Sequence, residues 1–370
     1  MIDPLELHHS AFVADLHCDT VLRIRQGRDF SVRNERGHID LPRLQEGGVG
    51  LQVFASWIDN ELPADRCRAE ADSLIDLLET TFSPLSDRIV ICHDQDEVLT
   101  AGAAGKIAAL LSIENGTAIE NNLANLEHFY ERGVRLITLT HFKSSEWCES
   151  SSDSESKISG LSEFGREVVT EMNRLGMIVD ISHASVKAAE HVLETTTVPI
   201  VASHSCVHEI CRVDRNLTDE QIRAIADNGG MIGLNLSTGF INQEWENVAR
   251  EFYEARKDEI DSVDDLFDAG IKPHDHIKPV YREFWDTTDK VQVTIEQAVD
   301  HIDHIYKLVG ADHIGLGSDF DGIARSPEGL ADCSQWPNLT AELVRRGYRA
   351  REIRKILGGN FLRIIGDVCG

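Results

Sequence analysis

Seven side chains that can bind a metal ion or carry a proton follow short apolar runs in this 370-residue sequence. They are imidazoles and carboxylates, which zinc takes as ligands in catalytic sites. In chain order they are His17, Asp19, Glu114, His141, His183, His204 and Asp319. A lone histidine after a strand is usually a loop or capping residue. Seven metal-competent side chains after six runs instead indicate one shared metal site.

Five of these side chains can hold two divalent ions if one carboxylate bridges the pair. Glu114 is the natural bridge, with His17 and Asp19 completing one shell and His183 and His204 the other. Imidazole and carboxylate ligands without a thiolate favour zinc with open coordination positions. We therefore expect two Zn²⁺ ions per chain, bridged by Glu114 and a water or hydroxide that can attack a carbonyl carbon.

The triplet His17-Cys18-Asp19 follows the apolar run 12–16. If this run is a β-strand that continues through the triplet, alternate side chains share a face, so His17 and Asp19 point the same way. Cys18 then points to the opposite face, and we do not expect it to be a ligand. By itself the triplet is a weak motif, because only the other strand ends supply the remaining ligands.

The apolar runs that must position these residues read as buried parallel strands alternating with helices. The expected strands are 12–16, 51–57, 107–113, 134–140, 177–181, 198–202, 230–236 and 313–318. Expected helices include 67–82, 122–131, 162–176, 186–193, 218–228 and 295–309, followed by segments near 338–346 and 350–357. Eight such units predict an α/β protein with a (β/α)8 TIM-type barrel, whose active site lies at the carboxyl ends of the strands.

We expect residues 1–370 to form a single domain with one insertion after strand seven. Residues 238–290 interrupt the alternation and are densely charged, so they are assigned to this insertion, as a lid or a dimer contact. The segment 143–159 is rich in serine and acidic residues and is expected to be a loop.

Composition excludes several classes of function. The chain has 63 acidic and 36 basic residues, a net charge of −27, so nucleic acids and anionic membranes are not expected partners. No signal peptide or membrane span is predicted. The eight cysteines are scattered and form no Cys-x-x-Cys pair. This cysteine usage is typical of reduced thiols, and we expect a cytoplasmic protein.

Other histidines and serines imitate functional motifs. The triplet His274-Asp275-His276 lies between prolines inside the insertion and is expected to be a surface loop. His301 and His304 are expected at partly exposed positions of one helix. Ser182 and Ser203 each precede a histidine of the site. Because adjacent residues of a strand face opposite ways, neither pair is expected to form a catalytic dyad. Asp321 either supports a residue of the site or forms a turn, and we expect the turn.

The motifs extend over nearly the whole sequence. They occupy residues 15–20, 112–116, 133–141, 180–183, 203–205, 215–216, 315–322 and 358–361. In these motifs the sequence resembles the membrane dipeptidase (renal dipeptidase) family of zinc peptidases, within the amidohydrolase-like barrels. By this resemblance, Asp19 occupies a position where many related barrels have a second histidine.

The resemblance implies a binuclear zinc dipeptidase that tolerates a D-residue at the C-terminal position of its substrate. By the same resemblance His141 is not a ligand but binds the carbonyl oxygen and stabilises the oxyanion. Asp319 is implied as the general base and acid. Arg215 is implied to pair with the carboxylate of a small dipeptide. A homodimer is also expected from the family.

Two other functions stay open from the sequence. The first is a binuclear metallohydrolase acting on another amide, such as an N-acyl amino acid or a lactam. The second is a binding or scaffold protein on an inactive barrel, against which the intact set of ligands argues.

Overall fold

The strands of this protein close into a parallel barrel, as the sequence predicts. The computed structural model describes residues 3–261 and 276–370. Its strands are β1 (Val13–Asp15), β2 (Val49–Trp57), β3 (Ile89–Ile91), β4 (Ile107–Glu114), β5 (Val134–Thr138), β6 (Ile178–Asp180), β7 (Val201–Ser205), β8 (Met231–Leu234) and β9 (Ile314–Leu316). Strand β1 pairs with both β2 and β9, β2 pairs with β4, and β4 to β9 pair in sequence. The eight barrel strands are those expected from the apolar runs.

Strand β3 is an addition that the sequence did not predict. It pairs with residues Ile107 to Ala109 of β4, whereas β5 pairs with β4 from Leu111 onward. The extra strand therefore extends one side of the sheet near the start of β4 without entering the barrel. Its three residues are too few to show a periodic pattern.

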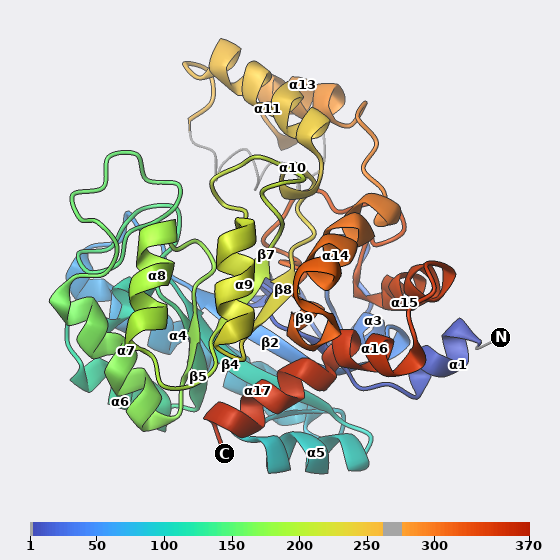
Figure 1. Cartoon of the computed structure of the whole chain (residues 1–370), viewed down its shortest axis with the longest axis horizontal. Helices are drawn as coiled ribbons and strands as arrows, with labels where there is room; N and C mark the ends of the chain where they lie inside the picture. The colour runs from blue at the N-terminus through green and yellow to red at the C-terminus, as the bar shows by residue number, and fades with distance from the viewer. Residues whose placement is uncertain (1–2, 262–275) are drawn as a thin grey trace.

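Helices follow most barrel strands and surround them (Figure 1). They are α1 (Pro4–His9), α2 (Thr20–Arg25), α3 (Leu41–Glu46), α4 (Cys67–Phe82), α5 (Gln95–Ala103), α6 (Ala124–Glu131), α7 (Glu163–Leu175), α8 (Val186–Thr195), α9 (Asp219–Asp227), α14 (Ile295–Val309), α15 (Trp336–Arg345), α16 (Ala350–Arg354) and α17 (Asn360–Val368). Serine and threonine side chains fix several helix starts: Ser162, Ser185 and Thr218 each accept a hydrogen bond from the third backbone N–H of their helix.

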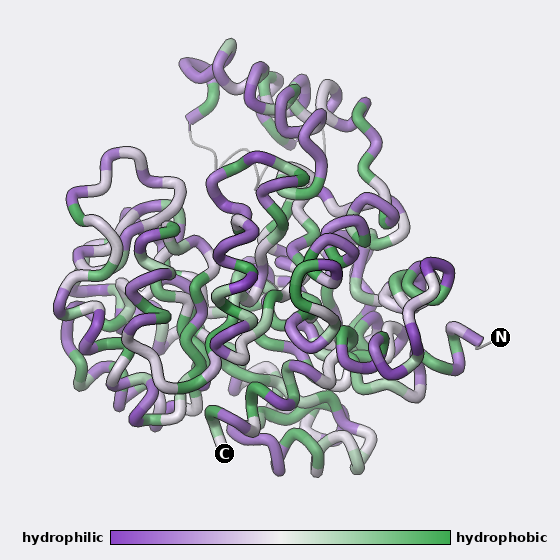
Figure 2. The backbone as a smooth tube through the Cα atoms, in the orientation of Figure 1, coloured by the Kyte–Doolittle hydropathy of each residue, from purple (hydrophilic) through white to green (hydrophobic). Residues whose placement is uncertain are grey.

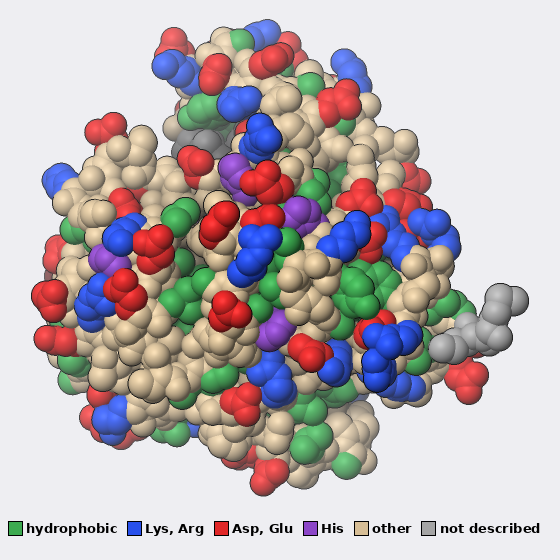
Figure 3. Space-filling view, in the orientation of Figure 1, with side chains coloured by type: hydrophobic (Ala, Val, Ile, Leu, Met, Phe, Trp, Pro, Cys, Tyr) green, Lys and Arg blue, Asp and Glu red, His purple; other side chains and the backbone are tan. Residues whose placement is uncertain are grey.

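The core has two parts, because alternate residues of a strand face opposite sides. One apolar cluster joins strand residues such as Leu51, Leu110 and Ile178 to residues of α5 and α17. The larger cluster lies between the strands and the surrounding helices. Figure 2 shows the strands as largely hydrophobic tube in the middle of the molecule, with hydrophilic segments toward the outside. Figure 3 shows acidic and basic side chains interspersed over one face.

The segment 238–290 follows β8, the seventh strand of the barrel. It contains α10 (Thr238–Ile241), α11 (Gln243–Arg256) and α13 (Pro279–Thr288), and α11 and α13 lie side by side at the top of Figure 1. Their aromatic rings hold them together: Phe284 lies 6.3 Å from Trp245 and 5.6 Å from Phe252, measured between ring centroids. Among the described residues, no helix is both long and apolar enough to cross a membrane.

Candidate active site

The barrel brings all seven predicted side chains to one end. Glu114 is the last residue of β4, and its two carboxylate oxygens face different imidazoles. Its Oε2 lies 3.5 Å from Nε2 of His17, and its Oε1 lies 3.1 Å from Nε2 of His183 and 3.3 Å from Nε2 of His204. The carboxylate is buried, and burial raises its pKa, while His17 opposes this shift. Glu114 thus connects the two halves of the cluster.

His17 and Asp19 form the first half, although not for the reason expected. Strand β1 ends at Asp15, so the triplet lies beyond the strand, and Asp19 directly precedes α2. Nε2 of His17 nevertheless lies 3.5 Å from Oδ2 of Asp19. Cys18 points away, since its Sγ donates to the carbonyl oxygen of Val53. Burial disfavours charge on His17, but Glu114 and Asp19 outweigh it and hold the pKa of His17 well above its usual value.

His183 and His204 form the second half. Their Nε2 atoms lie 3.0 Å apart, and both rings are buried. Burial, together with positive charge on Arg215 and neighbouring imidazoles, lowers both pKa values well below the usual value. His183 has a left-handed backbone (φ = 67°), which a non-glycine residue rarely adopts. Such strain is often found at functional sites. Two neutral imidazoles facing one carboxylate oxygen are suited to a cation.

The donor set fits the predicted metal ions. Three groups of side chains lie close enough together to share an ion: His17, Asp19 and Glu114; Glu114, His141 and His183; and His17, His204 and Asp319. Both ring nitrogens of His17 and Nδ1 of His183 are buried without a hydrogen-bond partner among the described residues. Buried polar atoms are normally paired, and of these nitrogens Nε2 of His17 faces Asp19 and Glu114, where an ion would pair with it. Imidazole and carboxylate donors without a thiolate match zinc chemistry.

Asp319 lies beside the first half, after β9. Its Oδ1 is 3.9 Å from Nε2 of His17, and its Oδ2 accepts a hydrogen bond from the side-chain amide of Asn235 at 2.9 Å. Burial raises the pKa of Asp319 to about 8; His17 opposes this, and the negative charges of Asp19 and Glu114 add to it. Asn235 was not among the site residues predicted from the sequence. The one feature that could have identified it is its position: Asn235 is a polar residue at the end of the seventh barrel strand, for which no site residue was predicted.

His141 is a neutral group at the edge of the cluster. Its Nε2 lies 3.9 Å from Oε1 of Glu114, and its ring lies 5.5 Å from that of Trp57. Burial and the positive charges of Arg215 and His17 lower the pKa of His141 to about 3. A neutral imidazole has one N–H, so His141 can donate a hydrogen bond without carrying charge.

Arg215 is buried, not a surface arginine. Its Nη1 donates to Oγ of Ser205 at 2.9 Å, and its Nη2 donates to the carbonyl oxygen of His204 at 2.7 Å. Its Nε has no hydrogen-bond partner within the part of the chain that the structure describes. Burial lowers the pKa of Arg215, and Asp319 opposes the shift. A guanidinium group stays charged in proteins, so the site contains a cation with an unused donor.

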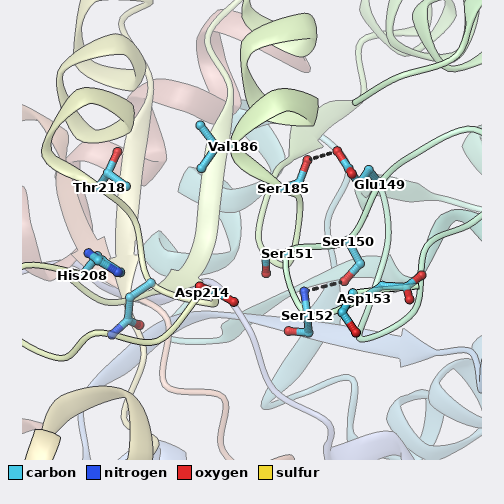
Figure 4. Close-up of a pocket in the computed structure, with 12 residues that line it drawn as sticks. Glu149, Ser150, Ser151, Ser152, Asp153, Ser185, Val186, His208, Asp214 and Thr218 are labelled. Atoms are coloured by element: carbon cyan, nitrogen blue, oxygen red, sulfur yellow. Dashed lines mark hydrogen bonds between the residues drawn. The ribbon is translucent and has the colours of Figure 1, made fainter. Parts of the chain in front are cut away.

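A polar cavity of about 340 Å³ opens beside the site, between the loops that follow β5, β6 and β7 (Figure 4). Two serines of its wall are attached to histidines of the site. Oγ of Ser150 donates to the carbonyl oxygen of His141, and the backbone N–H of Ser151 donates to that of His183 at 2.8 Å. The cavity wall and the site histidines therefore share one hydrogen-bonded framework.

Two predictions about other residues were wrong, and the first concerns His301. His301 is fully buried on α14, where Nδ1 accepts from Val207 N–H and Nε2 contacts the carbonyl oxygen of Ile241, both at 3.0 Å. Asp321 lies in a turn, as predicted, and its buried carboxylate also pairs with Arg28 at 2.6 Å. The same carboxylate accepts a hydrogen bond from the hydroxyl group of Thr20 at 2.9 Å. The local sequence reveals neither set of distant partners.

Ser203 and His204 do not face opposite ways, contrary to expectation. Oγ of Ser203 lies 2.7 Å from Nδ1 of His204. The reason is an irregularity in β7: its register with β8 shifts between Ala202 and Ser205, which breaks the alternation of side chains. His304 is partly buried on α14, as predicted, and lies 2.7 Å from Asp219. The triplet at 274–276 was expected to be a surface loop. Its first two residues lie outside the described residues, and His276 is exposed.

The fold and the site define a barrel enzyme with a metal-competent centre, and comparison with known proteins agrees. The model of the membrane dipeptidase family (peptidase family M19) matches residues 4–369. The chain belongs to this family of metallopeptidases and is a peptide-bond hydrolase of the dipeptidase class. It is 29% identical over 369 residues to dipeptidase tcpJ of Claviceps purpurea, covering 96% of this chain and 76% of that protein.

Solved structures show the same fold. Dipeptidase AC, a metallopeptidase of family M19, superposes with a TM-score of 0.80 at 26% identity, covering 98% of this chain and 99% of that one. A metallopeptidase from Rhodobacter sphaeroides, solved with a phosphinate mimic of the dipeptide L-Ala-D-Ala, has a TM-score of 0.79 at 24% identity. That match covers 97% of this chain and 99% of the other.

Proposed function

We propose that this protein is a binuclear zinc dipeptidase that hydrolyses small dipeptides and tolerates a D-residue at their C-terminal position. The observation that carries the proposal is the position of Glu114. Its Oε2 faces His17, and its Oε1 faces His183 and His204. A carboxylate with its two oxygens directed at separate sets of imidazoles can bridge a pair of ions.

His17 and Asp19 would hold one zinc ion, His183 and His204 the other, and Glu114 both. When bound, the two ions would supply a hydroxide nucleophile near neutral pH for attack on the peptide carbonyl. Nε2 of His17 supports this assignment, because it faces Asp19 and Glu114 and is buried without a hydrogen-bond partner among the described residues.

Asp319 would act as general base and acid. Burial raises the pKa of its carboxyl group, which favours uptake of a proton there. The hydrogen bond from Asn235 to Oδ2 leaves Oδ1 directed toward His17. The proton would reach the leaving amine from Oδ1.

His141 and Arg215 would orient the substrate. Neutral His141 can donate its N–H to the carbonyl oxygen as negative charge develops there, and such contacts are typically worth a few kcal/mol. Arg215 has an unused Nε donor in a buried position, suited to the C-terminal carboxylate of a dipeptide. The dipeptide mimic bound to the Rhodobacter relative motivates L-Ala-D-Ala as a test substrate.

The test compares hydrolysis of L-Ala-D-Ala and L-Ala-L-Ala with hydrolysis of N-acetyl-alanine, alongside zinc analysis of the purified protein. We expect two zinc ions per chain and cleavage of both dipeptides. Cleavage of N-acetyl-alanine alone would favour the amide-hydrolase alternative. Protein with neither zinc nor activity, even after zinc addition, would favour an inactive scaffold.

We also propose that the protein is a homodimer, as the family resemblance implies, and that it is cytoplasmic, as its scattered cysteines indicate. Light scattering at micromolar concentration should give twice the mass of the 41.2 kDa chain. A mass equal to one chain would contradict the dimer.

A further inference from the structure

The carboxylate of Asp180, the last residue of β6, is fully buried and accepts four hydrogen bonds. Oδ1 accepts hydrogen bonds from the backbone N–H groups of Ser182 at 3.0 Å and Ser203 at 2.8 Å. Oδ2 accepts the hydroxyl groups of Ser203 and Thr138, each at 2.6 Å. No part of the mechanism above uses Asp180, although it lies beside two of the predicted metal ligands.

The hydroxyl of Ser203 has a defined direction. Because its proton is donated to Asp180, its oxygen is left to accept, and Nδ1 of His204 lies 2.7 Å away. Ser182 is consistent with this order, since its Oγ accepts the backbone N–H of His204 at 3.0 Å and can donate to Oγ of Ser203 at 3.3 Å. His204 therefore carries its proton on Nδ1.

The other ring nitrogen of His204, Nε2, then carries no proton and has a lone pair available. Nε2 lies 3.3 Å from Oε1 of Glu114 and 3.0 Å from Nε2 of His183, so the lone pair points into the cluster. A metal-binding histidine usually has its second nitrogen fixed in this way, which selects the tautomer and the ring orientation. Here a serine stands between the carboxylate and the imidazole.

We propose that Asp180 is a positioning residue for the second metal ion, acting through a hydrogen-bond relay of Asp180, Ser203 and His204. The inference rests on the proposed function, because the relay matters only if His204 is a ligand. The irregularity in β7 makes the relay possible, since it lets two consecutive side chains meet.

The fold contains a matched control for this relay. Asp15, at the end of β1, accepts the backbone N–H of Ser318 at 2.8 Å and its hydroxyl at 2.5 Å. Ser318 precedes Asp319 as Ser203 precedes His204. Its oxygen, however, accepts the backbone N–H of Phe320 at 3.1 Å, so this second Asp–Ser pair braces backbone.

The test is zinc affinity, measured by competition with a chromogenic chelator on the full chain. Ser203→Ala and Asp180→Asn should each lower the affinity for one of the two zinc ions by about 10- to 100-fold. The affinity for the other ion should not change. Ser318→Ala should leave both affinities within about threefold of wild type. Circular dichroism and thermal unfolding show whether each variant is folded, and Ser203→Ala carries the test if Asp180→Asn does not fold.

A second readout needs no metal. Nitrogen NMR of zinc-free protein labelled at histidine should show one Nδ1-protonated ring whose signals shift in Ser203→Ala. If both Ser203→Ala and Asp180→Asn bound two zinc ions as tightly as wild type, with unshifted histidine signals, the relay would be overturned and the proposed function would stand. Wild-type protein that binds no zinc would overturn the proposed function as well.

Discussion

The side-chain amide of Asn235 donates a hydrogen bond to Oδ2 of Asp319 over 2.9 Å. The two residues follow neighbouring strands, β8 and β9, at the same end of the barrel. This contact fixes one carboxylate oxygen and leaves the other, Oδ1, 3.9 Å from Nε2 of His17. The left-handed backbone of Asp319 (φ = 61°) is a further sign that its side chain is held in place.

Asp319→Asn should keep both zinc ions and lose turnover by a factor of about 10² to 10⁴, because the amide cannot accept and return the proton. Steady-state kinetics with L-Ala-D-Ala and zinc analysis of the same sample measure both quantities. Asn235→Ala should have a smaller effect on kcat. Loss of one zinc ion from Asp319→Asn would make Asp319 a ligand instead of the proton carrier.

Arg215→Ala should raise KM by about 10- to 100-fold with a smaller change in kcat, since a hydrogen bond to a charged group is worth roughly 1.5–3 kcal/mol. The matched control is Arg212→Ala, three residues away and exposed, which should leave KM unchanged. An unaltered KM in folded Arg215→Ala would remove Arg215 from substrate binding.

Glu114→Gln should reduce the zinc content from two ions to one or none, because a neutral amide replaces the carboxylate between the two sets of imidazoles. Zinc per chain is measured after dialysis against a weak chelator. The exposed Glu155→Gln serves as the control and should retain both ions. Two tightly held ions in Glu114→Gln would refute the bridging role.

Gly322→Ala should impair the site with little effect on the fold. A methyl group at this position would overlap Oδ2 of Asp19 and lie 2.6 Å from Oδ1 of Asp319. Both carboxylates must move, so we expect weaker zinc binding and lower kcat. Gly102→Ala, on α5 with open space around it, is the matched control and should be neutral. Wild-type activity in Gly322→Ala would show that the two carboxylates are freely adjustable.

The stability of the protein should depend on pH through His301. Burial lowers its pKa to about 4, below the value of about 6.5 in an unfolded chain. The unfolded state therefore binds a proton more readily, and the stabilisation present above pH ~6.5 is lost as pH falls toward ~4. From pH 7 to pH 5 the free energy of unfolding should fall by about 2 kcal/mol more than in His301→Gln. Urea titrations that show the same pH dependence in both proteins would contradict this.

The sequence by itself determined the barrel and the identity of the clustered side chains. Buried parallel strands appear as nearly continuous apolar runs, and the polar residue that follows each run must lie at the same end of the barrel. Glu114, the last residue of β4, and Asp319, beyond the end of β9, are such cases. The strand bounds were less accurate: β1 ends before His17, yet His17 and Asp19 still meet.

Only the tertiary structure decided which atoms face one another. The opposite orientation of the two oxygens of Glu114 depends on three other strands and loops. The contact between Ser203 and His204 depends on an irregularity in pairing with β8, and the burial of His301 depends on what packs over its helix. Local periodicity tells which residues share a face of one element, whereas these contacts arise between elements distant in the chain.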